Sequence, residues 1–165
     1  MKLKLILFFC LISFLAQSQN LEDVKQNLIG EWSYVETVDS NGNKVESLNK
    51  YYIDGKESKI LCSGPNISIY PDNTYIKVFT EINSDKGNWK LISKDEIEYV
   101  MVIPKESRQG RLIIQTQKML NKKWRQDDKG NFLDEHSEKI LLLTEDRMEV
   151  EYENYSRLIY KKITR

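Results

Sequence analysis

The stretch Leu28-Ile29-Gly30-Glu31-Trp32-Ser33-Tyr34-Val35 joins a short helical segment to a strand that begins with an aromatic residue. Upstream of it, Asn20 offers a capping oxygen to an acidic first turn, and Leu21, Val24 and Leu28 fall on one helical face. Gly30 ends this helix, and aromatic and β-branched residues follow as far as Thr37. We therefore expect most of the later chain to form strands that close around this stretch.

Turn-forming residues separate the later apolar segments into hairpins. One hairpin is expected at residues 66–70 and 74–80 across Pro71-Asp72-Asn73, and a second at 87–92 and 96–103 across Ser93-Lys94-Asp95. In the last of these segments Ile97, Tyr99, Met101 and Ile103 occupy alternate positions, which predicts that they share one face of a strand. The opposite face begins with glutamates and ends with Val100 and Val102, so its far half should be covered.

The final third of the chain continues the strand pattern. Residues 104–110 read as a polar loop, 111–124 as a strand with mixed faces, 127–131 as a turn and 139–144 as an apolar strand. Met148, Val150 and Tyr152 then alternate with three glutamates, Glu149, Glu151 and Glu153, which we interpret as a solvated outer face. A last strand is expected over residues 158–163.

These segments predict an all-β protein, an antiparallel up-and-down β-barrel of about eight strands with a short N-terminal helix. Closure into a barrel is favoured over an open sheet because it removes exposed strand edges. A β-sandwich is the main structural alternative.

The first 18 residues predict a secretory signal peptide, which leaves residues 19–165 as a single domain. Two lysines precede an apolar run at residues 5–15, and Ala16-Gln17-Ser18 supplies small residues for cleavage before Gln19. The run is shorter than the roughly 20 residues that span a bilayer, which argues against a transmembrane helix. Cys10 raises a lipoprotein anchor as a third interpretation, but Phe8 and Phe9 stand where small residues are wanted. We expect an exported protein, periplasmic or secreted, without membrane insertion once the signal is removed.

Charge and cysteine content narrow the functional classes further. The chain has 25 basic and 25 acidic residues, and this balance argues against a nucleic-acid partner. Cys62 would be the one cysteine left after signal removal, so no internal disulfide is expected, and its apolar neighbours favour a buried thiol.

The chain resembles the lipocalin-like proteins, and more closely the small exported lipocalin-like domains of bacteria. The resemblance lies in Gly30-Glu31-Trp32 at the start of the first strand, in the same spacing at Gly87-Asn88-Trp89, and in the late hairpin over residues 140–160. It implies a calycin-type barrel in which Trp32 closes one end and an arginine of the last strand, here Arg157, packs across it. The threonine-aspartate-tyrosine motif of classical lipocalins is not recognisable. The resemblance also implies that residues 44–65 form a long loop over the open end, which carries Tyr51 and Tyr52.

The sequence offers little for catalysis, and no enzyme activity or cofactor is expected. His136 is the only histidine, lacks a second histidine or cysteine at metal-ligand spacing, and reads as a solvated loop residue. Asp127-Asp128-Lys129-Gly130-Asn131 lacks the ligand spacing of a calcium loop, so no metal site is expected.

Binding is better supported than catalysis. An eight-stranded barrel is either just filled by side chains or able to hold one small ligand. The first hypothesis is a carrier or sensor of a small hydrophobic molecule, and the second is an envelope module with a filled barrel that binds a protein partner through the face of Val100 and Val102. The candidate ligand contacts are large residues that could either fill the interior or line a pocket: Tyr51, Tyr52, Trp89, Tyr99, Met101 and Tyr152, with Met148 as a further inward residue.

Overall fold

The structure is a closed antiparallel barrel, which confirms the fold class expected from the sequence. It is a computed structural model that describes residues 21–51, 55, 57–120 and 123–164. Hydrogen-bonded neighbours follow the order β1-β10-β9-β8-β7-β6-β5-β4 around the barrel, and β4 returns to β1. The eight strands are β1 Gly30–Val38, β4 Asn66–Ile69, β5 Thr74–Thr80, β6 Asn83–Ser93, β7 Glu96–Ile103, β8 Phe132–Leu143, β9 Arg147–Glu151 and β10 Arg157–Lys162.

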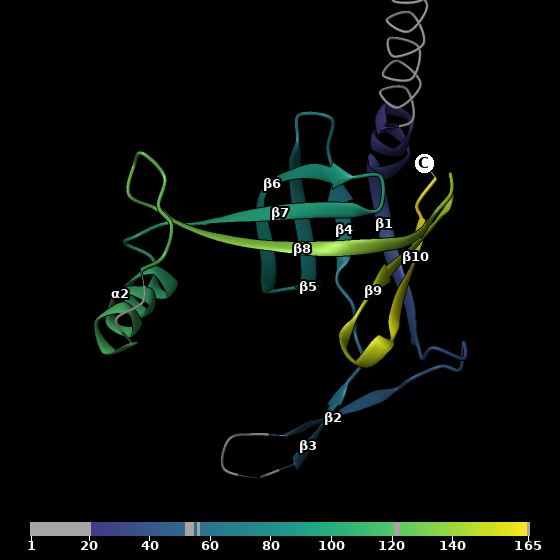
Figure 1. Cartoon of the computed structure of the whole chain (residues 1–165), viewed down its shortest axis with the longest axis horizontal. Helices are drawn as coiled ribbons and strands as arrows, with labels where there is room; N and C mark the ends of the chain where they lie inside the picture. The colour runs from purple at the N-terminus through teal and green to yellow at the C-terminus, as the bar shows by residue number, and fades with distance from the viewer. Residues whose placement is uncertain (1–20, 52–54, 56, 121–122, 165) are drawn as a thin grey trace, which may run out of the picture.

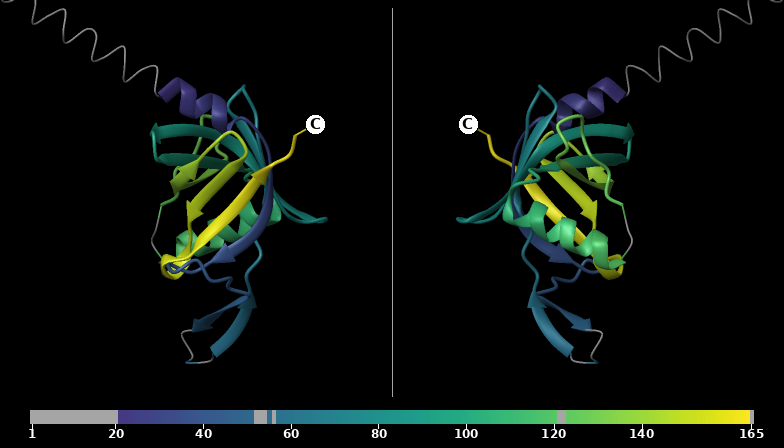
Figure 2. Two further views of the ribbon diagram at one scale, coloured as in Figure 1. Left: turned by 90° about the vertical axis from the view of Figure 1, so that its right-hand side faces the viewer. Right: turned by 90° about the vertical axis from the view of Figure 1, so that its left-hand side faces the viewer.

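Helices and a small second sheet lie around the barrel. Residues 21–28 are helical and sit at one end, and β2 Ser47–Tyr51 pairs with β3 Glu57–Leu61 beyond the other end (Figures 1 and 2). A 3₁₀ turn, Glu153–Tyr155, joins β9 to β10. Among the described residues, no helix has the length and apolar character needed to cross a bilayer. The signal peptide expected at residues 1–18 lies outside the described residues.

Two-residue alternation explains which side chains fill the barrel. In β7, Ile97 and Tyr99 are 1% exposed and Ile103 is 5% exposed, whereas the residues between them are only partly buried. The same alternation in the other strands builds one large apolar core: Leu28, Trp32, Ile67, Ile69, Tyr75, Trp89, Ile97, Tyr99, Ile140, Met148, Val150, Leu158 and Tyr160.

Trp32 closes the barrel at the end next to the helix. Its side chain is completely buried, and its indole Nε1 donates a hydrogen bond of 2.8 Å to the carbonyl oxygen of Leu28. Gly30 makes this junction possible because its φ is +143° and a Cβ there would lie 2.5 Å from the Lys162 side chain. The indole is therefore attached to the end of the helix and packed within the main core.

The cation over the Trp32 indole is Lys162, and this corrects the expectation for Arg157. The Lys162 ammonium lies 5.0 Å from the indole centroid and donates to the carbonyl oxygen of Asn27 at 2.8 Å. Arg157 begins β10 and pairs with Val38 at the far end of β1, one strand length away from Trp32. The antiparallel register therefore decides which basic residue reaches the tryptophan.

Glu149 also departs from the sequence interpretation. Its carboxylate was expected on a solvated face, but the side chain is only 8% exposed. It lies 2.8 Å from Arg147 and 2.9 Å from Arg157, and both arginines donate hydrogen bonds to it. Arg157 thus belongs to an ion-pair cluster on β9 and β10 rather than to the closed end.

The segment expected as a strand at 111–124 is mostly a helix, α2 Arg108–Leu120. Its start is capped by Ser107, whose hydroxyl accepts a hydrogen bond from the Gly110 amide at 2.9 Å. Gly110 and Ile113 are buried and Ile114 packs beside them, which is the three- and four-residue spacing of an amphipathic helix. Runs of β-branched residues favoured the strand interpretation, whereas this capping serine and spacing indicated the helix.

Two further segments differ from expectation. The long connection at 44–65 contains the β2–β3 pair, and β8 begins at Phe132 rather than near Lys139. The early part of β8 is polar because it borders the open end of the barrel. The alternating apolar pattern of a strand is therefore absent from that part.

Replacing Trp32 by alanine should remove the largest buried side chain at the closed end. We expect the free energy of unfolding to fall by about 3–5 kcal/mol, as for other deletions of large aromatic residues from cores. Urea denaturation of the wild type and the variant would measure this. Ile82→Ala is the control, because Ile82 is 98% exposed at the β5–β6 hairpin and its loss should change little; equal effects of the two substitutions would contradict the assignment.

Candidate functional site

A cavity of about 320 Å³ opens at the end of the barrel opposite Trp32, and we call it the mouth cavity. β5, β6, β8 and β10 contribute its walls, and the end of β9 with the β9–β10 connection contributes part of its rim. Its lining residues are Pro65, Lys77, Phe79, Asp85, His136, Glu138, Glu151, Tyr152, Glu153, Leu158 and Tyr160.

Lys77 is the unusual residue of this site, because its side chain is buried inside the barrel. Alternation along β5 turns Tyr75 and Lys77 inward, and the Lys77 side chain is 4% exposed. The ammonium lies 2.5 Å from a carboxylate oxygen of Glu138 and 3.7 Å from the centroid of the Tyr99 ring. Burial lowers the pKa of Lys77, and the Glu138 carboxylate opposes that shift. A buried charge of this kind persists because an opposite charge and an aromatic face compensate for its lost hydration.

His136 lies beside this ion pair and is a strand residue, not the loop residue expected from the sequence. Its ring stacks on Tyr99 with a centroid distance of 5.3 Å, and its Nε2 lies 3.4 Å from the Lys77 ammonium. Burial and the neighbouring Lys77 cation lower the pKa of His136, against the opposing carboxylates. These effects favour the neutral imidazole, although the His136 side chain is 43% exposed.

Tyr75 places a neutral phenol next to the same cluster. Its ring packs edge-on against Tyr99 at 4.7 Å, and its buried hydroxyl oxygen has no hydrogen-bond partner among the described residues. Burial raises the pKa of Tyr75, and the carboxylates of Asp85, Asp134 and Glu138 raise it further. A buried hydroxyl without a partner costs about 1–3 kcal/mol, so this group is a ready donor for a polar atom that enters the barrel.

The rim of the mouth cavity combines aromatic surface with negative charge. Phe79 and Tyr152 line the cavity and are 43% and 39% exposed, so part of each aromatic side chain remains in contact with solvent. Asp85, Glu151 and Glu153 stand on the same rim, and no ion pair joins any of these three to another described residue. Because Glu138 already neutralises Lys77, the cavity has a net excess of negative charge.

The structure distributes the candidate ligand contacts over several places. Tyr152 lines the mouth cavity, whereas Trp89 and Tyr99 are buried in the large core. Trp89 donates from Nε1 to the carbonyl oxygen of Tyr70 at 3.1 Å. Met101 packs on a separate small cluster beneath α2, formed by Ile103, Ile113 and Phe132. Tyr51 is the last residue of β2, and Tyr52 lies outside the described residues.

Sequence reasoning missed four residues of the site, namely the charged Lys77, Asp85 and Glu138 and the aromatic Phe79. One signal was present in β5, where Tyr75, Lys77 and Phe79 occupy alternate positions. A lysine on the same strand face as two aromatic residues indicates a charge that points toward the barrel interior.

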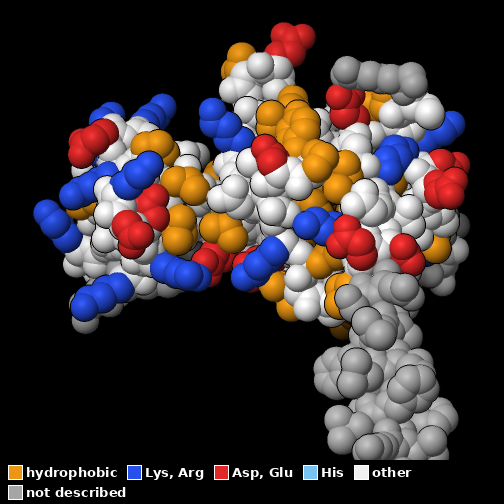
Figure 3. All heavy atoms as spheres, turned by 90° about the horizontal axis from the view of Figure 1, so that it is seen from above, with side chains coloured by type: hydrophobic (Ala, Val, Ile, Leu, Met, Phe, Trp, Pro, Cys, Tyr) orange, Lys and Arg blue, Asp and Glu red, His pale blue; other side chains and the backbone are white. Residues whose placement is uncertain are grey.

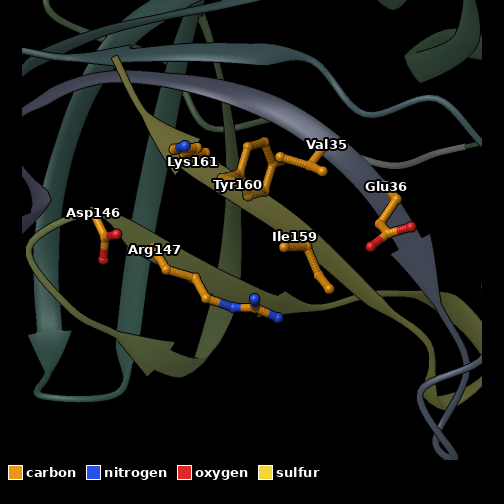
Figure 4. A pocket seen from close by; sticks show the side chains of 7 residues that line it. All are labelled: Val35, Glu36, Asp146, Arg147, Ile159, Tyr160 and Lys161. Atoms are coloured by element: carbon orange, nitrogen blue, oxygen red, sulfur yellow. The ribbon is translucent and has the colours of Figure 1, made fainter. Parts of the chain in front are cut away.

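Two other cavities lie on the outer surface of the barrel and are less suited to a ligand. One cavity, of about 280 Å³, is lined by residues of β1, β10 and the start of β9 (Figure 4). Its charged lining residues are Glu36, Asp146, Arg147 and Lys161. The other, of about 380 Å³, is lined in part by Val102, Ile76 and Tyr70. Val102 lines this cavity, and Val100 and Val102 are both partly buried. In residues 21–164, apart from the undescribed positions, no group of three histidine, cysteine or acidic side chains could hold a metal ion.

Closure by eight antiparallel strands, the buried Trp32 at one end and a cavity at the other define the architecture. This is the closed eight-stranded barrel that the resemblance to lipocalin-like proteins implied. A lipocalin-like protein from Bacteroides uniformis is 15% identical, with 83% of this chain and 99% of that chain aligned at a TM-score of 0.43. An uncharacterized protein from Bacteroides eggerthii is 17% identical, with 82% and 98% aligned at a TM-score of 0.42. The chain matches no protein-family model and has no significant match among curated proteins.

The lowered pKa of His136 predicts a pH-dependent loss of stability. Below about pH 6.5 the unfolded chain takes up a proton on this imidazole that the folded barrel resists. The contribution of His136 to the free energy of unfolding is therefore fully present above pH 6.5. This contribution is lost as the pH falls toward the lower pKa of His136 in the folded state. His136→Phe keeps an aromatic ring on Tyr99 but removes the titration, so the variant should lose less stability than the wild type between pH 7.5 and 5.5.

Urea unfolding at the two pH values would measure this difference. The comparison of the same two proteins between pH 7.5 and 8.5 is the control, because neutral imidazole is present throughout that range. Equal losses of stability in the two proteins between pH 7.5 and 5.5 would show that His136 does not resist protonation.

Proposed function

We propose that this protein binds a small ligand in the mouth cavity, with an apolar body against the aromatic wall and a positive charge toward the rim. The proposal rests mainly on one observation, the cavity of about 320 Å³ that joins exposed aromatic rings to unpaired carboxylates. This volume is at the lower end of the range for small-molecule sites. The function is one of binding, as a carrier or sensor, without a catalytic step.

The packing of the barrel supports a ligand at the mouth rather than at its centre. Trp32, Trp89 and Met148 are at most 3% exposed, and with their neighbours they fill the half of the barrel nearest the helix. Leu158 and Tyr160 border both this core and the cavity, so they form an apolar floor. A ligand would therefore rest on this floor without displacing core side chains.

The charges of the mouth cavity favour a cationic ligand over an anionic one. Lys77 is held by Glu138, so its charge is already compensated. Asp85, Glu151 and Glu153 remain on the rim beside Phe79 and Tyr152. Aromatic faces and carboxylates together are the usual surroundings of an organic ammonium group.

Binding of three matched probes would test the charge preference. We expect phenyltrimethylammonium to bind about fivefold more tightly than its uncharged isostere tert-butylbenzene, because one favourable charge contact at an exposed rim is worth about 1 kcal/mol. Benzoate should bind more weakly than either. Ligand-observed NMR titration would give the three affinities.

Variants of the rim would show whether the cavity is responsible. Asp85→Asn combined with Glu151→Gln should remove the preference for the cation, and Phe79→Ala should weaken binding of both the cation and its neutral isostere. Glu81→Gln is the matched control, because Glu81 is exposed at the β5–β6 hairpin and does not line the cavity. An affinity order without charge preference, or one unchanged in the rim variants, would contradict the proposal.

We further propose that the protein is exported after removal of residues 1–18. The basic start, the apolar run and the small residues before Gln19 support this proposal. Intact-mass measurement of the protein from its native host should give a chain that begins at Gln19. A mass that includes Met1 would show that no signal peptide is removed.

A further inference from the structure

The segment at 104–131, which carries α2, is much more basic than the rest of the chain. The whole chain has equal numbers of basic and acidic residues. Figure 3 shows Lys and Arg side chains gathered over the lobe on the left, where Figure 1 places α2. The described residues of this segment include seven basic residues and three acidic ones. The basic residues are Lys105, Arg108, Arg111, Lys118, Lys123, Arg125 and Lys129, and the acidic residues are Glu106, Asp127 and Asp128.

The packing of α2 determines which face it presents to solvent. Ile113 is 8% exposed and packs with Ile103 and Phe132 at the ends of β7 and β8. Gly110 lies on the same buried side, where a Cβ would come within 2.3 Å of the carbonyl oxygen of Pro104. This close approach holds the helix in one orientation against the strands.

The opposite face of α2 exposes large apolar side chains. Leu112 and Met119 are seven residues apart and therefore on the same side of the helix, and they are 53% and 83% exposed. Leu120 is 66% exposed at the end of the helix. Arg108 stands one turn before Leu112 on this face, so apolar and cationic groups are interleaved. Lys118 precedes Met119 by one residue and therefore lies about 100° around the helix, at the border of this side. We call Arg108, Leu112 and Met119, with Lys118 at their border, the outer face of α2.

The cations of the outer face are available to a partner. Arg108 and Lys118 are exposed, and neither makes an ion pair with another described residue. Lys123, just beyond the helix, is exposed and also makes none among the described residues. Arg125 differs from these three because it pairs with Glu135.

We propose that the outer face of α2 docks on the surface of an anionic lipid bilayer. The cations complement negatively charged headgroups. The apolar side chains of Leu112 and Met119 reach the apolar boundary below the headgroups. A nucleic acid would use the cations but gain nothing from two exposed apolar side chains. The binding is peripheral and is independent of the mouth cavity proposed above.

Vesicle co-sedimentation tests this proposal. The protein used should begin at the N-terminus that intact-mass measurement establishes for the protein from its native host. We expect binding to vesicles of phosphatidylcholine with one quarter phosphatidylglycerol, and little binding to phosphatidylcholine alone. Arg108→Glu with Lys118→Glu should weaken binding at least roughly 30-fold, because each cation near an anionic surface contributes about 1 kcal/mol. Leu112→Ser with Met119→Ser should also weaken it.

Matched controls separate this face from a general charge effect. Lys59→Glu with Lys94→Glu changes the net charge equally on exposed residues of β3 and of the β6–β7 turn, and should leave binding unchanged. Equal loss in this control, equal binding to neutral vesicles, or full binding by the Leu112→Ser, Met119→Ser variant would each overturn the proposal. Retained circular dichroism in every variant shows that the fold is intact.

Discussion

The hydrogen bond from the Trp32 indole to the Leu28 carbonyl joins the N-terminal helix to the barrel, and the arrangement of the interior depends on it. The bond ties the last turn of the helix to the first strand, so Leu28 also lies at the closed end with no exposed surface. Gly30 lies between the two residues with a backbone conformation that other residues rarely adopt. With this end sealed by apolar groups, polar side chains that point inward can be hydrated or bound only from the opposite end.

That asymmetry explains why a lysine can be buried in the barrel at all. An ammonium deep in the apolar core would have no water and no counter-charge, which would favour loss of its proton. At the level of Lys77, two strands supply what the charge needs: Glu138 and His136 from β8 and the Tyr99 ring from β7. The Tyr75 hydroxyl has no hydrogen-bond partner among the residues that the structure describes, and the cavity above this cluster takes its chemical character from the rim.

The sequence was sufficient for the parts of the fold that depend on local periodicity and turn residues. The hairpin around Pro71-Asp72-Asn73 and the alternation of Ile97 with Tyr99 belong to this class. Residues whose environment is made by distant strands were harder to interpret. Arg157 and Lys162 are both basic residues of β10, and only the register with β1 decides which of them reaches Trp32.

The polar site was hidden from sequence reasoning for the same physical reason. His136 and Glu138 alternate on β8 as Lys77 and Phe79 do on β5, but polar side chains on a strand normally indicate its solvated face. Their inward direction follows from the closure of the barrel, which places β5 and β8 opposite each other across a narrow interior. For α2, the capping residue Ser107 was a local signal of a helix. The apolar run Leu112-Ile113-Ile114, however, is as typical of a strand as of a helix.

The balanced charge of the whole chain conceals two local excesses of opposite sign. The rim of the mouth cavity is acidic at Asp85, Glu151 and Glu153, whereas the outer face of α2 is basic. At physiological salt, charges act over about 8 Å, so a partner responds to the nearest cluster and not to the sum. The overall composition therefore gave no information about either cluster. The barrel fold allows the two charge clusters to be separated. Alternation along the strands directs one set of side chains inward, whereas α2, in the connection between β7 and β8, carries a different set outward.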